Sequence, residues 1–195
     1  MKRSTLIKII MAVFASLAVL FALTLLLPMV SRLIIGSDNS QTDAESDYLD
    51  ISNDVAYLAF DRNIYYNEYG FEAPVDPADP AALGKASAFF YKYFNALISG
   101  DGQAYRACFD KNYLAKNEVA GEFLPQRLYD ISATLYSRTA DGGKSVDIFT
   151  VRFKIYKNDG AVFDCESNKT YTTVFKLSSV DGETVITDVL EYKVG

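Results

Sequence analysis

The side chains available for chemistry in this chain are chiefly tyrosines and carboxylates, because its 195 residues include no histidine. This absence excludes histidine general bases, histidine metal sites, and Ser-His or Cys-His nucleophile pairs. The sequence also lacks a Gly-rich phosphate loop, a Cys-x-x-Cys pair and a carboxylate-rich calcium loop. We therefore assign no catalytic residue and expect no metal and no cofactor.

The two cysteines, Cys108 and Cys165, leave two alternatives open. In an oxidising compartment they would form one disulfide that closes a long loop. Otherwise they remain two unpaired thiols. The sequence does not decide between these alternatives.

The charge distribution is strongly asymmetric. All 25 acidic residues follow Arg32, but only 15 of the 19 Lys and Arg do, so this part carries a formal charge of −10. Such a charge repels phosphate backbones and anionic lipid headgroups. We therefore expect no nucleic-acid partner.

The segment Ile9–Val30 carries no charged side chain over 22 residues. As a helix rising about 1.5 Å per residue it would cover roughly 33 Å, enough to cross the hydrocarbon core of a bilayer. The positive-inside rule then places the N-terminus in the cytoplasm and the rest of the chain outside. The basic residues before the span are Lys2, Arg3 and Lys8.

Two alternatives to this membrane span stay open: a cleaved signal peptide and a buried core helix. The apolar run is longer than a signal h-region and has no Ala-x-Ala site. We expect a cytoplasmic tail over residues 1–8, a transmembrane helix with its exit over 9–35, and membrane contact through 9–30. The predicted location is the cell membrane, with a single pass and an outer C-terminal domain.

Residues 36–80 are expected to form an acidic stalk and an aromatic, Pro-rich linker. Gly36–Asp54 is rich in Ser, Asp and Asn, as is typical of a solvated tether. Val55–Phe71 carries six aromatic residues without a sustained period, and we expect a short helix followed by an extended piece. These aromatics either pack on their own domain or form a partner-binding strip. Three prolines within Glu72–Pro80 predict a boundary.

A long amphipathic helix is predicted over Ala81–Ser99. Asp79 is suited to the N-cap and Pro80 to the first helical position. Gly100 would end this helix, and further short helices are expected over Gly102–Phe109 and Tyr113–Val119.

The pattern after Pro125 changes to alternating apolar and polar residues with Asp-Gly turns, which is typical of antiparallel hairpins. A bulge is expected over Phe163–Lys169. The fold class is therefore α+β, with the helices packed on a curved four-stranded antiparallel sheet. The four expected strands are Arg127–Thr139, Lys144–Lys157, Ala161–Ser178 and Glu183–Val194.

The order of these elements resembles the nuclear transport factor two-like superfamily, a cone-shaped α+β fold. The resemblance covers about Ala81–Val194, and its main cue is FFYKYFNALISGDGQAYRACF at Phe89–Phe109. It implies a domain over residues 81–195 whose sheet wraps the long helix and leaves a pocket at the open end of the cone. The superfamily includes enzymes, ligand-binding domains and assembly modules, so fold alone does not choose a function.

Three functions are compatible with this fold. The preferred one is a non-catalytic, membrane-anchored extracytoplasmic binding or assembly module, such as a scaffold subunit of a cell-envelope, secretion or conjugation complex. Its partner would be another protein or a second copy. The residues expected on the partner face are Thr150, Arg152, Lys154, Tyr156 and Thr172.

The alternatives place a function in the cone pocket. In the first alternative, the expected pocket residues bind a small apolar ligand. The same residues could instead fill a solid core. Isomerase-like chemistry would use Tyr91 or Tyr93 with a carboxyl group from Asp110, Asp130 or Asp164. The expected pocket residues are Phe90, Tyr93, Phe94, Phe149 and Phe153.

Overall fold

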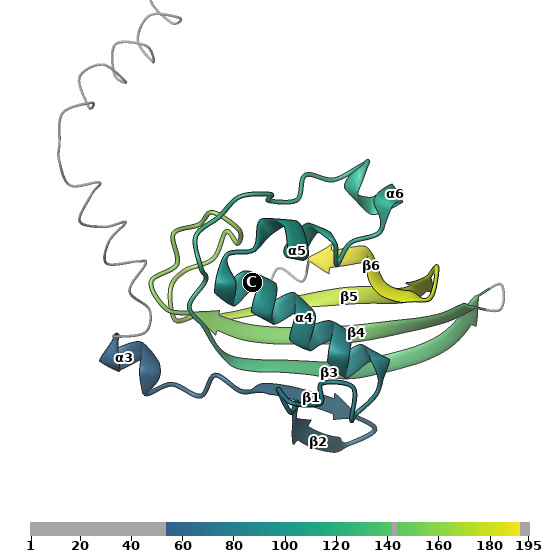
Figure 1. The fold of residues 1–195 in the computed structure, drawn as a ribbon, viewed down its shortest axis with the longest axis horizontal. Helices are drawn as coiled ribbons and strands as arrows, with labels where there is room; N and C mark the ends of the chain where they lie inside the picture. The colour runs from purple at the N-terminus through teal and green to yellow at the C-terminus, as the bar shows by residue number, and fades with distance from the viewer. Residues whose placement is uncertain (1–53, 142–143, 192–195) are drawn as a thin grey trace, which may run out of the picture. The chain divides into compact units, whose positions relative to one another are not determined.

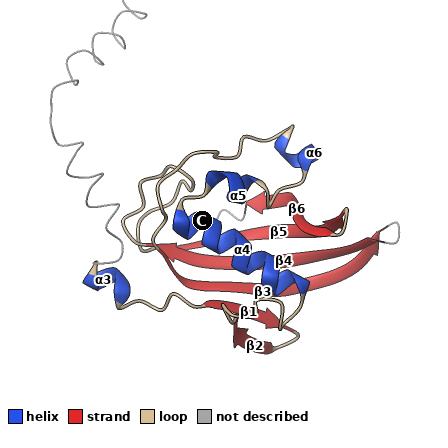
Figure 2. Cartoon of the chain, viewed as in Figure 1, coloured by secondary structure: helices blue, strands red, loops and turns tan. Residues whose placement is uncertain are grey.

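A computed structural model of the chain describes residues 54–141 and 144–191, which form a twisted sheet crossed on one face by a helix (Figures 1 and 2). The strand order is β2-β1-β3-β4-β5-β6. The elements are α3 (Val55–Leu58), β1 (Ile64–Glu68), β2 (Phe71–Pro74), α4 (Lys85–Ser99), α5 (Gly102–Arg106), α6 (Lys111–Leu114), β3 (Leu128–Asp141), β4 (Lys144–Ile155), β5 (Thr170–Val180) and β6 (Glu183–Glu191).

The predicted four-stranded antiparallel sheet was wrong, because the sheet has six strands and is mixed. The two additional strands, β1 and β2, come from the segment assigned to the stalk and linker. They form an antiparallel hairpin, and β1 pairs with β3 in parallel from Ile64↔Ile131 to Asn67↔Thr134. A parallel pair needs a crossover connection, which α4, α5 and α6 provide. The short helix and extended piece predicted over 55–71 are confirmed as α3 and β1.

The predicted helix over 81–99 was too long, because α4 begins only at Lys85. The residues just before α4 form turns. Gly84 at the N-cap has a φ of 114°, and a continuous helix cannot pass through a residue with this backbone angle. The buried Ser87 hydroxyl instead donates to the carbonyls of Pro80 and Gly84 at 2.7 and 2.8 Å. The predicted end is confirmed, since Gly100 adopts a left-handed φ of 71°.

The core lies between α4 and the concave face of the sheet, defined here as the face that α4 covers (Figure 1). Phe90 and Phe94 on α4 contact Phe149 and Phe153 on β4, with ring centroids 4.9 and 5.8 Å apart. All four side chains are fully buried. Inward residues alternate along β4, as the sequence pattern predicted.

The predicted bulge over 163–169 was wrong, because β5 begins only at Thr170 and the preceding residues form a loop. Asn158 holds this loop through its side-chain amide, which donates to the carbonyls of Phe163 and Cys165 at 2.9 and 2.6 Å. Backbone groups of the loop are thus satisfied without a strand partner.

No helix within residues 54–141 and 144–191 is long and apolar enough to cross a membrane. Within these residues the expected fold class is therefore corrected to an α+β domain with a six-stranded mixed sheet and no membrane-spanning helix. The tail (1–8), the proposed span and exit (9–35) and the first part of the stalk lie outside the described residues. The domain limits and the cell-membrane location stay predictions.

Candidate functional site

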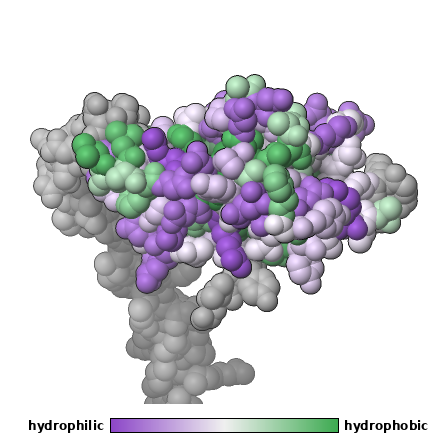
Figure 3. All heavy atoms as spheres, turned by 90° about the horizontal axis from the view of Figure 1, so that it is seen from below, coloured by the Kyte–Doolittle hydropathy of each residue, from purple (hydrophilic) through white to green (hydrophobic). Residues whose placement is uncertain are grey.

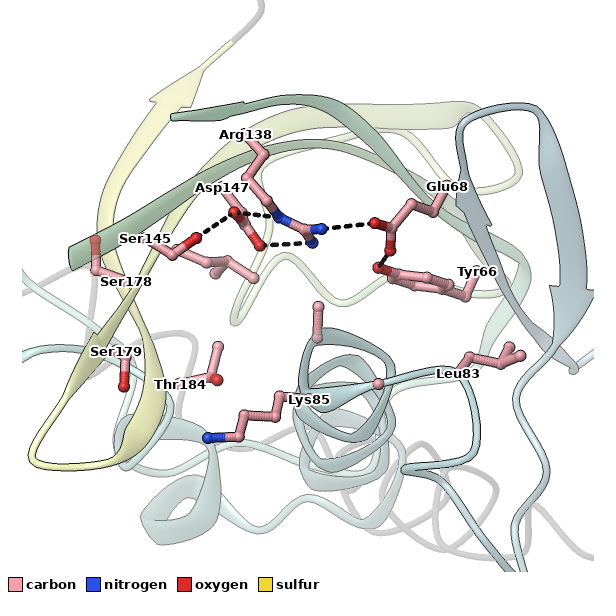
Figure 4. A pocket seen from close by; sticks show the side chains of 13 residues that line it. Tyr66, Glu68, Leu83, Lys85, Arg138, Ser145, Asp147, Ser178, Ser179 and Thr184 are labelled. Carbon is pink, nitrogen blue, oxygen red and sulfur yellow. Dashed lines mark hydrogen bonds and ion pairs between the residues drawn. The ribbon is translucent and has the colours of Figure 1, made fainter. Parts of the chain in front are cut away.

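An open cleft of about 510 Å³ lies on the concave face, between the first turn of α4 and the sheet (Figure 4). Its walls come from β1, β3, β4, β5, β6 and the start of α4. Most of the residues that line it have polar side chains, whereas the core beside it is apolar. They include Tyr66, Glu68, Lys85, Arg138, Ser145, Asp147, Ser178, Ser179 and Thr184.

Arg138 is at the centre of a charged network on one wall of the cleft (Figure 4). Its Nε and Nη2 donate to the two carboxylate oxygens of Asp147 at 2.9 and 3.0 Å. Its Nη1 donates to Glu68 Oε1 at 2.7 Å. Ser145 Oγ donates to Asp147 at 2.9 Å, and the Tyr66 hydroxyl donates to Glu68. Each of these two carboxylates therefore has at least two donors, a charge-assisted arrangement that fixes their orientation.

A β-bulge explains why Arg138 points into the cleft. Leu135 pairs with Phe149, but Ser137 pairs with Ile148, so Tyr136 is an extra residue in β3. The extra residue shifts the alternation and places Arg138 opposite Asp147. Regular pairing would have turned the arginine to the convex face.

The network also shifts the pKa values of two of its own groups. Burial, together with the hydrogen bond to Glu68, raises the pKa of the Tyr66 hydroxyl. Hydrogen bonds and charge from Asp147 and Glu68 raise the pKa of Arg138. Both groups therefore stay protonated near pH 7 and do not serve as general bases there. Lys85 approaches from α4 on the opposite wall (Figure 4).

Three exposed aromatic side chains, Tyr69, Phe71 and Tyr136, lie in the β1–β2 hairpin and in the bulge of β3, close in register to this network. They are 80%, 63% and 79% exposed. Asn67 pairs with Thr134, and two residues after each of them come Tyr69, in the turn that follows β1, and Tyr136, in β3. Phe71 pairs with Glu68 in the hairpin. We call Tyr69, Phe71 and Tyr136 the aromatic rim.

The aromatic run over 55–71 is divided by burial, and its role as a partner-binding strip stays a prediction. Tyr57 and Tyr66 are buried, whereas Tyr69 and Phe71 are exposed. Figure 3 views the molecule from the side of the β1–β2 hairpin and shows apolar surface among hydrophilic residues.

The predicted pocket residues lie in the core and not in the cleft. Phe90, Phe94, Phe149 and Phe153 pack on one another with no exposed surface. Tyr93 instead lines a separate, smaller cavity. None of the described pockets is lined by all five residues, so no common cavity for an apolar ligand is found among these pockets.

The predicted partner-face residues lie together on the convex face, since Arg152 pairs with Thr172 and Thr150 follows on the same strand. Lys154 forms an ion pair with Asp130 at 2.9 Å. Tyr156 is half-buried, because the rings of Tyr57 and Phe60 pack on it. The face is continuous, and its role as a docking surface stays a prediction. The five residues are Thr150, Arg152, Lys154, Tyr156 and Thr172.

The tyrosines and carboxylates expected for isomerase-like chemistry each have a different local environment. Tyr93 is fully buried and hydrogen bonded to Tyr105. Asp110 caps α6 by accepting from the backbone N–H of Asn112, and Asp130 pairs with Lys154. Tyr91 is half-buried and Asp164 is exposed. Over the described ranges, no group of three Cys, Asp or Glu side chains is arranged to hold a metal.

Both cysteines are free thiols. Cys108 is buried, and burial raises its pKa to about 11. Cys165 is half-buried, and burial also raises the pKa of its thiol. Since the thiolate is the reactive form, we expect Cys165 to react first with a disulfide reagent at pH 8 and Cys108 to react only after unfolding.

Timed labelling of the full chain, with and without denaturant, measures this difference. A Cys165→Ser variant is the control and should lose the early reaction. Equal native rates for the two thiols would contradict the buried position of Cys108.

A scan of the sequence against protein-family models gave no match, and a search among curated proteins also found no match. The functional assignment therefore depends on the geometry of the cleft and the aromatic rim.

Proposed function

We propose that residues 54–191 form a non-catalytic binding module, of the nuclear transport factor two-like type, that docks a protein partner at the aromatic rim and the adjoining cleft. The observation that carries this proposal is the strong exposure of Tyr69, Phe71 and Tyr136, which the strand register places near Glu68 and Arg138 of the charged network. Exposed Tyr and Phe are enriched in protein interfaces, where they supply large contact areas at low entropic cost.

The cleft complements the rim chemically. Hydroxyl groups of Ser145, Ser179 and Thr184 and the ammonium of Lys85 line it, which suits the hydrogen-bonding groups of a polypeptide segment. Arg138 is already engaged by two carboxylates, so a strongly anionic ligand is less well suited.

The protonation of two groups of the network supports a binding role. The raised pKa values of Tyr66 and Arg138 hold both groups protonated, so neither accepts a proton near pH 7.

Site-specific photocrosslinking in cells that express the full chain tests the proposal. A photoreactive phenylalanine analogue at Tyr69 or Tyr136 should give a discrete protein adduct. The matched control is the same analogue at Arg152 on the convex face, which should give none.

The outcomes separate the two candidate surfaces. An adduct of twice the chain mass at the rim identifies a second copy as the partner. Adducts only at Arg152 would favour the convex face, and no adduct at any of the three positions would contradict a protein-binding role.

A further inference from the structure

The two walls of the cleft differ in whether their polar groups are already engaged. On one wall, both carboxylates of the charged network pair with Arg138, at 2.7 and 2.9 Å. On the other wall, the side chains of Lys85, Ser179 and Thr184 form no hydrogen bond or ion pair within the described part of the chain. The hydrogen-bond donors that remain open to a ligand therefore include those contributed by α4, β5 and β6.

These three open groups share one end of the cleft. Ser179 pairs with Thr184 across β5 and β6. Lys85 and Thr184 line the cleft together, and both also line a second hollow of about 280 Å³ between α4 and the β5–β6 turn. Figure 4 shows the Lys85 side chain extending from α4 toward the wall that carries Thr184 and Ser179, and away from Arg138. The ammonium group and the two hydroxyls thus form one set of donors.

The chemistry of this set matches a carboxylate. A lysine ammonium donates up to about three hydrogen bonds and accepts none, and a Ser or Thr hydroxyl adds one donor each. An ionised carboxylate only accepts, and its two oxygens have room for about four donors. Hydrogen bonds between opposite charges are stronger than those between neutral groups. A carboxylate therefore uses both the charge of Lys85 and the neighbouring hydroxyls.

The charge of the cleft favours a single carboxylate over a phosphate. The formal charges that line it sum to zero, since Lys85 and Arg138 oppose Glu68 and Asp147. The whole chain carries a formal charge of −6, which repels a doubly charged phosphate more strongly than a carboxylate. Arginine is the side chain that binds phosphate in a bidentate manner, but Arg138 is already engaged by two carboxylates. One acidic side chain on a polypeptide segment fits these conditions.

We propose that Lys85, together with Ser179 and Thr184, binds the carboxylate of an aspartate or glutamate in the segment of the partner that docks in the cleft. This inference rests on the proposed docking function, because the acidic side chain reaches Lys85 only when the partner is bound. The α4 side of the cleft then selects an acidic segment, while the charged network on the opposite wall stays closed on itself.

Zero-length crosslinking of the rim adduct tests this contact. The full chain with the photoreactive analogue in place of Tyr69 is first joined to its partner in cells, and the adduct is purified. A water-soluble carbodiimide then condenses an amine with a touching carboxylate into an amide and is itself converted into a urea. Peptide mass spectrometry should find Lys85 joined to an aspartate or glutamate of the partner. Lys92, a second exposed lysine of α4 that does not line the cleft, is the matched control and should give no such link.

Two variants measure the contribution of the charge. Lys85→Gln removes the charge and keeps a side chain of similar length, so the yield of the rim photoadduct should fall about two- to fivefold, as is typical of an exposed ion pair. Lys92→Gln makes the same change outside the cleft and should leave the yield unchanged. Circular dichroism of both purified variants verifies that they are folded.

The outcomes distinguish this inference from the docking function on which it rests. A rim adduct without a link from Lys85 to the partner would overturn the carboxylate assignment and leave the docking function intact. A link from Lys85 only to the neighbouring Glu183, or equal yields for Lys85→Gln and Lys92→Gln, would overturn it as well. The absence of any rim adduct would contradict both proposals.

Discussion

Replacing Phe90 with alanine is expected to lower the free energy of unfolding by about 3–5 kcal/mol, the range found for buried Phe→Ala changes. Phe90 has no exposed surface and its ring meets Phe89 and Phe149 at centroid distances of 5.3 and 4.9 Å. The fixed backbones of α4 and β4 prevent the neighbours from closing the cavity. Urea denaturation of the full chain followed by circular dichroism measures the loss.

Phe71→Ala is the matched control, because the same atoms are removed from a side chain that is 63% exposed. Its expected effect is within about 0.5 kcal/mol, as for most surface substitutions. Similar losses for the two variants would contradict the position of Phe90 at the centre of the core.

Gly102→Ala is expected to cost about 3 kcal/mol, at the upper end of the usual range for overpacking. A Cβ at residue 102 would lie 1.9 Å from the carbonyl oxygen of Gly121, which is backbone and has little freedom to move. The intrinsic gain from Gly to Ala in a helix is only about 1 kcal/mol, so the clash dominates. Thermal unfolding measures the effect.

Gly121→Ala tests the same contact from its other side. The nearest atom to a Cβ at residue 121 is Cδ of Arg106 at 3.4 Å, an ordinary contact with a flexible side chain. We expect a change below about 1 kcal/mol. A Gly102→Ala variant as stable as Gly121→Ala would show that α5 does not pack against this loop.

Local signals in the sequence predicted the second half of the fold well. Asp181-Gly182 forms the expected tight turn, with φ values of 51° and 87°. Gly100 ends α4, and Asp101 caps α5 by accepting from the N–H of Ala104 at 2.8 Å. These features depend on residues close in the chain, which is why the sequence alone reveals them.

The β1–β2 hairpin was missed because its pattern is weak and its partner is distant. β2 reads Phe-Glu-Ala-Pro, and a proline is admitted there because β2 is an edge strand. β1 is defined by its parallel pairing with β3, 67 residues away at Ile64↔Ile131. A long-range pairing of this kind leaves no local signature.

The charged network was missed for a related reason. Arg138 and Asp147 lie on either side of a predicted turn, so their opposite charges could have indicated an ion pair between the two strands. Regular pairing, however, would have placed them on different faces of the sheet. The bulge takes Tyr136 out of the pairing and so keeps Arg138 opposite Asp147, and the sequence does not mark this bulge. The ligand pocket was assigned to phenylalanines that instead fill the core, because apolar periodicity does not distinguish a lined cavity from a packed one.

Because of the bulge, the pairing of Arg138 with Asp147 and the exposed aromatic side chain at Tyr136 can change independently of each other. Tyr136 has no residue opposite it, so deleting this one position would keep Arg138 in register with Asp147. The inner surface of the cleft would be preserved, while one of the three rim aromatics would be lost. A change of chain length at this single position is therefore a route by which related chains can alter the outer contact and keep the inner one.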